Sequence, residues 1–332
     1  MIHLYDLSPP LTRRWIPGDQ YPRALLRALL RPLRGTPPIG LGKWTRNLCL
    51  GLDRIRQPWK MHHSPDLPPG DDVVGVINGP LGPFRLVASA RRCVTGVGGL
   101  NFPGEWPTFF EDTRSAFHLQ SCEWASAIYR PFFGDRVRTF AVGIDTDRYA
   151  PRQNVPKEFD FLVYNKIRWP GELPGTDLRA VCLAELGRRG FSHSEIRYGR
   201  YPGGKEGSYH DLAARCRAML FLCENETQGI AYNEAMSMGL PILAWNPGRW
   251  LDPNRHAHGL GDCPATSVPY WDERCGEQFA QPGEFAAAVD RFVDRLRAGR
   301  YAPRDYMLEN LTLERCARNY VAFLAEANET VR

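Results

Sequence analysis

The chain has 332 residues, enough for two domains of about 150 residues that each bury a core of their own. Hydrophobic residues make up 43% and charged residues 24% of the sequence, a balance that excludes a disordered or fibrous protein. A net charge of +5 is too small for this length to indicate nucleic acid as a partner. The nine cysteines show no zinc-binding spacing, so we expect reduced thiols.

No segment has the length and apolarity of a secretion signal or of a membrane span. The longest apolar run, Ala218–Cys223, is far too short to cross a bilayer. We therefore expect a cytoplasmic protein.

The first half of the chain shows buried strands that end in glycine turns, separated by helical segments. These features predict an α/β domain. The predicted strands are 2–7, 72–77, 92–97 and 136–142, and the predicted helices are 44–55 and 124–133. The helix at 44–55 follows a glycine-rich loop, Gly40-Leu41-Gly42-Lys43.

Residues 22–32 combine leucines and arginines in the pattern of a short amphipathic helix, with a proline at each end. We favour packing of the leucines on the N-terminal core, with the arginines in solvent. The alternative is peripheral contact with the inner face of an anionic membrane.

Strands and helices alternate regularly after a polar linker at residues 152–158. Alternation of this kind predicts a parallel sheet covered by helices. The predicted strands are 159–164, 195–198, 218–223 and 241–245, and the predicted helices are 177–188, 209–217 and 231–238. Two further helical patterns, around 285–296 and 320–324, end the chain.

The segment Cys223–Pro241 carries the clearest chemical pattern. A buried strand ends at carboxylates, a glycine loop follows, and a helix begins that carries another carboxylate, Glu234, eight positions after Glu226. Loop amides and the positive end of a helix favour an anion such as a diphosphate, and carboxylates accept hydrogen bonds from sugar and ribose hydroxyls. The pattern therefore indicates a sugar nucleotide. In the alternative interpretation, Glu234 merely complements the helix dipole.

This segment resembles the Glu-x7-Glu signature of retaining glycosyltransferases of the GT-B class, in particular family 4. Gly143-Ile144-Asp145 similarly resembles the interdomain segment of that family. The resemblance extends from about Ser121 to Trp245. It implies two Rossmann-like domains that face each other across a cleft. We expect an acceptor-side domain at 1–152, a nucleotide-sugar-binding domain at 153–310, and a C-terminal helix at 311–332 that can cross back to the first domain.

The resemblance also implies roles for individual donor-site residues. Glu226 would bind hydroxyls of the donor sugar, and Glu234 would bind the ribose. The backbone amides of Gln228, Gly229 and Ile230 would face the distal phosphate and the sugar.

Cations are expected beside the diphosphate. Lys166 matches the family's usual arginine and Arg168 is a looser match for its lysine, and both would stabilise the leaving diphosphate without a metal ion. The alternative is a solvent-exposed Lys and Arg. Gly40 and Gly42 would face the diphosphate from the first domain, unless their loop is an ordinary tight turn.

Several positions depart from the family pattern. Thr227-Gln228 replaces the usual Gly-Phe, and the loop at 97–103 lacks the family's sugar-supporting histidine. We interpret His118, on the next predicted strand, as structural. Asp145-Thr146-Asp147 matches a metal-binding Asp-x-Asp in form, but it lies in the interdomain segment, so we expect no metal.

The sequence thus predicts a metal-independent retaining glycosyltransferase of the hexosyltransferase type. It would move a sugar from a nucleoside diphosphate sugar to an acceptor hydroxyl, with no cofactor and no nucleic-acid partner. Two alternatives remain: a catalytically silent module that binds nucleotide sugars, and a nucleotide-sugar epimerase of the same fold.

Overall fold

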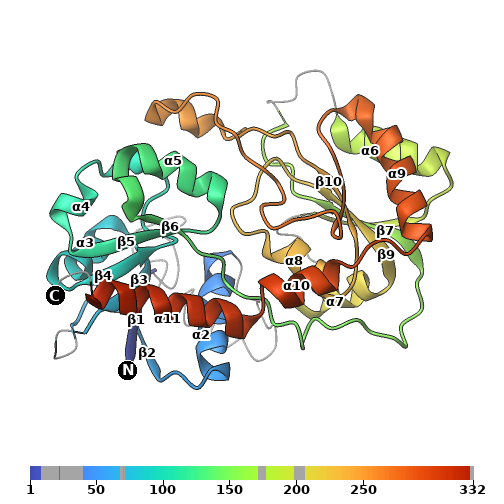
Figure 1. The fold of residues 1–332 in the computed structure, drawn as a ribbon. Helices are drawn as coiled ribbons and strands as arrows, with labels where there is room; N and C mark the ends of the chain where they lie inside the picture. The colour runs from blue at the N-terminus through green and yellow to red at the C-terminus, as the bar shows by residue number, and fades with distance from the viewer. Residues whose placement is uncertain are drawn as a thin grey trace.

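The computed structural model describes residues 1–8, 22, 40–67, 70, 72–170, 177–197 and 206–329, with 206–208 described by backbone alone (Figure 1). The basic helix predicted over 22–32 lies outside these residues, apart from Pro22. Its two interpretations, packing on the core or contact with a membrane, therefore stay predictions.

The first domain is built on a parallel sheet of six strands in the order β2-β1-β3-β4-β5-β6. The strands are β1 Ile2–Asp6, β2 Trp59–His62, β3 Val74–Asn78, β4 Cys93–Gly96, β5 Ser115–Gln120 and β6 Val137–Thr139. The helices are α2 Leu41–Arg54, α3 Leu81–Ala90, α4 Phe109–Asp112 and α5 Glu123–Phe133, with 3-10 turns at Pro103–Glu105 and Gly134–Arg136.

The second domain holds a parallel sheet of five strands in the order β11-β10-β9-β7-β8. The strands are β7 Phe159–Asn165, β8 His193–Arg197, β9 Cys216–Leu222, β10 Ile242–Trp245 and β11 Gly276–Phe279. The helices are α6 Leu178–Arg188, α7 Glu206–Ala214, α8 Ile230–Ser237 and α9 Phe285–Arg297, with 3-10 turns at Pro253–His258 and Pro282–Glu284. α10 Pro303–Asn310 and α11 Leu313–Glu329 end the described chain.

Two parallel sheets with interleaved helices confirm the predicted α/β class with two Rossmann-like units (Figure 1). The sequence did not predict β2, β11, α3, α4 or α10, and two of these elements show why. β2 is a four-residue edge strand, only partly buried, so it has no apolar run. α3 begins inside Gly79-Pro80-Leu81-Gly82, which reads as a glycine loop, because a proline near the first turn of a helix removes no internal hydrogen bond.

α11 returns from the second domain and packs on α2 of the first, as the red helix in Figure 1 shows. Two glycines make this contact close. A Cβ on Gly51 would lie 2.6 Å from the Leu313 carbonyl oxygen, and one on Gly143 would lie 2.5 Å from Leu313 Cα. Ile144 donates its N–H to the Leu311 carbonyl at 2.7 Å, which joins the interdomain segment to the start of α11.

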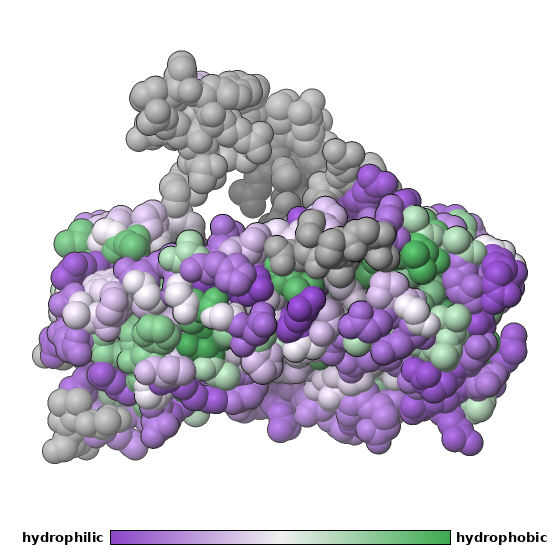
Figure 2. Space-filling view, turned by 90° about the horizontal axis from the view of Figure 1, so that it is seen from above, coloured by the Kyte–Doolittle hydropathy of each residue, from purple (hydrophilic) through white to green (hydrophobic). Residues whose placement is uncertain are grey.

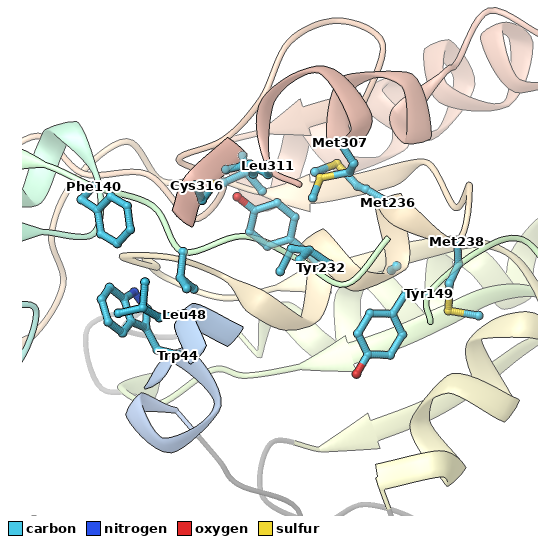
Figure 3. Packing of buried hydrophobic residues seen from close by; sticks show 14 of the residues in the cluster. Trp44, Leu48, Phe140, Tyr149, Tyr232, Met236, Met238, Met307, Leu311 and Cys316 are labelled. Atoms are coloured by element: carbon cyan, nitrogen blue, oxygen red, sulfur yellow. The ribbon is translucent and has the colours of Figure 1, made fainter. Parts of the chain in front are cut away.

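One cluster of buried side chains runs through both domains (Figure 3). Trp44 and Leu48 on α2 lie near Phe140, and the Trp44 and Phe140 rings meet edge to face at 5.6 Å. Met236 on α8 and Met307 on α10 lie together farther along the same cluster. Since apolar side chains of both domains are removed from water together, burial holds α2 and α8 in a defined relation.

On the face shown in Figure 2, hydrophobic residues form separate patches among hydrophilic ones. Among the described helices, none combines the length and the apolar composition needed to cross a bilayer.

Gly51→Ala tests whether the docking of α11 needs the glycine. The new methyl group meets the Leu313 carbonyl oxygen at 2.6 Å and Ala317 Cβ at 3.0 Å, so the helices must separate. We expect the free energy of unfolding in urea to fall by about 1–3 kcal/mol, the usual cost of overpacking.

Gly187→Ala in α6 is the matched control, because nothing lies within 4 Å of its Cβ position. A helix gains stability when alanine replaces glycine, so we expect a rise of about 0.4–1 kcal/mol. An equal response of the two variants would contradict the close packing of α11 on α2.

Candidate functional site

The loop between β9 and α8 forms the centre of the candidate site. Gly229 caps α8 with φ 69° and ψ 42°, the left-handed conformation that favours glycine. A Cβ there would also overlap the ring of Tyr232, which is fully buried. The glycine therefore allows the turn that brings the backbone of Gln228, Gly229 and Ile230 to the N-terminus of the helix, where amide groups and the helix dipole attract anions.

Glu226 forms an ion pair with Lys166, which the sequence predicted beside the donor diphosphate and not beside this glutamate. The Lys166 ammonium lies against Glu226 Oε1 in an ion pair. The backbone of Glu226 is held on both sides: its N–H donates to the Thr266 carbonyl at 3.0 Å, and its carbonyl accepts from Trp124 Nε1 at 2.8 Å. Because Trp124 belongs to α5, the first domain positions this glutamate directly.

Arg168 lies beside Glu224 and Asn225. Its guanidinium donates to the Asn225 carbonyl at 2.7 Å and stacks on the Trp169 ring at 4.3 Å. The fully buried Glu224 accepts the backbone N–H groups of Arg168 at 2.6 Å and of Trp169 at 2.8 Å. Glu224 thus shapes the turn after β7 that carries both predicted cations.

Glu234 is fully buried and pairs with two residues that the sequence analysis did not assign. Lys43 Nζ lies 2.5 Å from Glu234 Oε1, and His210 Nε2 lies 3.1 Å from Oε2. The helix predicted from Trp44 begins at Leu41, so Lys43 lies in its first turn and not in a loop. Lys43 directly follows Gly42 in the sequence, so adjacency to the glycines was a usable signal. His210 on α7 stands in no motif, and only the fold brings it to Glu234.

Gly40 and Gly42 lie at the start of α2, on the first domain. Gly40 is the N-cap, with φ 59° and ψ −123°, and Gly42 lies in the first helical turn. The next residue, Lys43, reaches Glu234 on α8. The N-terminus of α2 therefore faces α8 across the domain boundary.

Gln228 uses its side chain to join the domains. Its Oε1 accepts the Val142 N–H at 3.0 Å, and its Nε2 donates to the Val142 carbonyl at 3.2 Å. Both polar atoms of the side chain are used in this exchange, and the residue as a whole is 5% exposed. The departure from the family's Gly-Phe thus has a structural role here.

Asp145 and Asp147 pair with an arginine. Arg54 contacts Asp145 at 2.5 Å and Asp147 at 2.8 Å, and it also reaches Glu314 on α11 at 3.1 Å. Within the described part of the chain, no group of three His, Cys, Asp or Glu side chains is arranged to hold a metal ion. Through Arg54, the two aspartates join the interdomain segment to α2, and the same arginine reaches α11.

A cavity of about 440 Å³ opens between the interdomain segment and α10–α11. Its walls include Phe140, Tyr270, Tyr306, Leu311 and Phe323. The residues that line it include none of those predicted for the donor, so this cavity is separate from the candidate site.

His118 is buried in the sheet of the first domain and bonded at both ring nitrogens. Gln120 Nε2 donates to His118 Nε2 at 3.0 Å, so Nδ1 carries the proton and donates to Thr95 Oγ1 at 3.1 Å. Burial lowers the pKa of His118 to about 3. The imidazole is therefore a neutral structural group.

This lowered pKa predicts a pH dependence of stability. Because the folded pKa lies below the unfolded value of 6.5, His118 contributes stability above pH 6.5 that is lost as the pH falls. The loss is about 1.4 kcal/mol per pH unit below about 6.5. In urea unfolding at pH 7.5 and 5.5, the free energy of unfolding should fall more between the two pH values for the wild type than for His118→Gln. Identical pH slopes would show that the histidine is not buried in neutral form.

No family model and no curated protein matches this sequence. Solved structures do resemble it. WaaG, a glycosyltransferase involved in lipopolysaccharide biosynthesis, superposes with a TM-score of 0.54 at 11% identity, over 98% of this chain and 99% of WaaG. The pneumococcal O-GlcNAc transferase GtfA, in complex with UDP and GlcNAc, superposes with a TM-score of 0.51 at 13% identity. A TarM variant from S. aureus, in complex with UDP, superposes with a TM-score of 0.52 at 11% identity.

The shared lengths differ among these structures. This chain covers 57% of GtfA and 55% of TarM, using 78% and 76% of its own residues. It thus spans little more than half the length of those two proteins and nearly all of WaaG. The structural neighbours are GT-B glycosyltransferases, and the chain has their fold.

Proposed function

We propose that this protein is a retaining glycosyltransferase that moves a sugar from a nucleoside diphosphate sugar to an acceptor hydroxyl, without a metal ion or other cofactor. One observation carries the proposal: the Glu226–Lys166 pair, the N-terminus of α8 and the Glu234–Lys43 pair meet where the two domains face each other. Ligands of parallel α/β sheets bind at the carboxyl ends of the strands, which is where these groups lie.

The comparisons support the substrate class. GtfA is described with UDP and GlcNAc, and TarM with UDP. A trehalose-6-phosphate synthase, studied for glycosyltransfer with retention, superposes with a TM-score of 0.50 at 11% identity, over 85% of this chain and 78% of that enzyme. A nucleotide-sugar donor and a retaining outcome are therefore our proposals for this chain.

The donor's diphosphate would bind at the backbone amides of Gln228, Gly229 and Ile230. The left-handed Gly229 leaves no side chain there, and the positive end of α8 would attract the phosphates. Lys166 and Arg168 would add positive charge as negative charge develops on the leaving diphosphate.

The two glutamates would hold the two polyols on either side of the diphosphate. Glu226 would accept hydrogen bonds from the transferred sugar, and Glu234 would accept them from the ribose. In the transfer, the acceptor oxygen bonds to the anomeric carbon of the sugar as the bond between that carbon and the diphosphate oxygen breaks. The departing phosphate oxygen takes the acceptor's proton, so the step needs no protein nucleophile.

The acceptor would bind on the first domain. Polar side chains gather there at the carboxyl ends of β1 and β3. Thr45 donates to Asp6 at 3.1 Å, and Asn78 donates to Ser8 at 2.6 Å. Hydroxyl and amide groups of this kind bind polyhydroxyl compounds.

Substitution of each glutamate by glutamine should separate their roles. The ligand is the nucleoside diphosphate that gives the largest thermal shift among UDP, GDP, ADP and dTDP. We expect Glu234→Gln to weaken its binding about 10- to 100-fold, because a charge-assisted bond to ribose is lost. Glu226→Gln should leave that affinity nearly unchanged and sharply lower turnover of the sugar nucleotide, since free nucleotide carries no sugar.

Titration calorimetry measures the affinities, with Glu111→Gln as the control, because Glu111 is exposed on α4. Equal affinities and equal turnover in the wild type and the three glutamine variants would refute the donor-site assignment. Tight binding without turnover in the wild type would favour the silent binding module.

Saturating EDTA should leave the activity intact. In the proposed mechanism Lys166, Arg168 and the loop amides stabilise the diphosphate in place of a metal ion. The measurement is the initial rate of sugar transfer before and after chelation. Loss of all turnover, restored by Mn²⁺ or Mg²⁺, would contradict the metal-free mechanism.

A further inference from the structure

The ion pair between Lys43 and Glu234 joins the two domains at the candidate donor site. Lys43 lies in the first turn of α2, and Glu234 lies on α8. The two side chains are 15% and 0% exposed, and their charged atoms are 2.5 Å apart. A fully buried carboxylate needs a positive or donating partner, and Lys43 supplies it from the opposite domain.

Glu234 keeps a second partner on its other oxygen. His210 Nε2 lies 3.1 Å from Oε2, and the imidazole is packed against the rings of Tyr149 at 4.3 Å and Tyr209 at 4.9 Å. Because His210 is held in place by these rings, Glu234 stays bonded when Lys43 moves away. A ribose hydroxyl is a donor that can take the place of Lys43 at Oε1.

The position of Lys43 on its helix suits an anionic ligand. The first turn of α2 contains no acidic residue, so the lysine adds to the positive end of the helix dipole. A cation at that place is unfavourable unless a negative group faces it. The N-terminus of α8, where we place the diphosphate, lies about one helical turn (~6 Å) from Glu234, within the reach of a flexible lysine stem.

We propose that Lys43 exchanges partners when the donor binds. The ribose hydroxyl replaces the ammonium at Glu234, and the ammonium pairs with the diphosphate. Lys43, which belongs to the first domain, thus contributes to recognition of the donor's phosphates. This inference rests on the proposed function, since it requires a nucleoside diphosphate ligand.

The test compares a nucleoside diphosphate with its nucleoside, which carries ribose but no phosphate. UDP and uridine serve as probes, or the corresponding pair for the base that the thermal-shift screen selects. We expect Lys43→Met to weaken UDP binding about 10- to 100-fold and to leave uridine binding unchanged or tighter. Glu234→Gln should weaken both ligands by the same factor, because both carry the ribose.

Lys60→Met, an exposed lysine on β2, is the control and should bind both probes like the wild type. Melting temperatures measured in the same buffer check that each variant is folded. Lys43→Gln, which still donates hydrogen bonds but has no charge, provides the same comparison if Lys43→Met does not fold.

Three results would overturn the proposal in distinguishable ways. Equal loss of UDP and uridine affinity in Lys43→Met would make the lysine a structural partner of Glu234. Unchanged UDP affinity in that variant, with tight binding by the wild type, would overturn the partner exchange alone. Failure of the wild type to bind any of the nucleotides would overturn the proposed function and this inference with it.

Discussion

The burial of the Glu234 carboxylate is the constraint on which the candidate site depends. A carboxylate removed from water is strongly unfavourable without positive or donating partners, and this one has Lys43 and His210. Because Lys43 comes from the first domain, the requirement for charge compensation is also a requirement for the domains to meet. The same contact brings the N-terminus of α2 to face α8.

Neutral hydrogen bonds extend this contact along the domain boundary. Gln228 bonds to both backbone groups of Val142, and Trp124 donates to the Glu226 carbonyl. All three bonds involve the loop between β9 and α8. A change in the relative position of the domains therefore changes the geometry of the residues proposed to bind the donor sugar and diphosphate.

The return of α11 to the first domain adds a third link. Arg54 on α2 pairs with Asp145, Asp147 and Glu314, and so joins α2, the interdomain segment and α11. Arg304 on α10 donates to the carbonyls of Thr146 and Ser237, one on each side of the boundary. Arg54 and Arg304 thus add polar links between the domains to the apolar contacts of the cluster in Figure 3.

Local patterns in the sequence were sufficient for the α/β class and for most elements. Strands such as β9 are buried on both faces, so they stand out as apolar runs, and α9 shows one apolar face at helical spacing. Gly229 predicted a loop before α8, and the structure gives this glycine the left-handed conformation. The four-residue edge strand β2 was not predicted, because a partly exposed strand has no continuous run of apolar residues.

The partners of the site residues depended on contacts between residues far apart in the chain. Resemblance to a family predicted Lys166 and Glu226 as donor-site residues, but their ion pair was found only in the structure. His210 and Trp124 carry no local signal, and Lys43 had only its place after Gly42. Sequence by itself determined which segments form strand, loop and helix, because those preferences act between near neighbours. Only the tertiary structure decided which charges meet, because the compensation of a buried carboxylate is settled when two domains pack together.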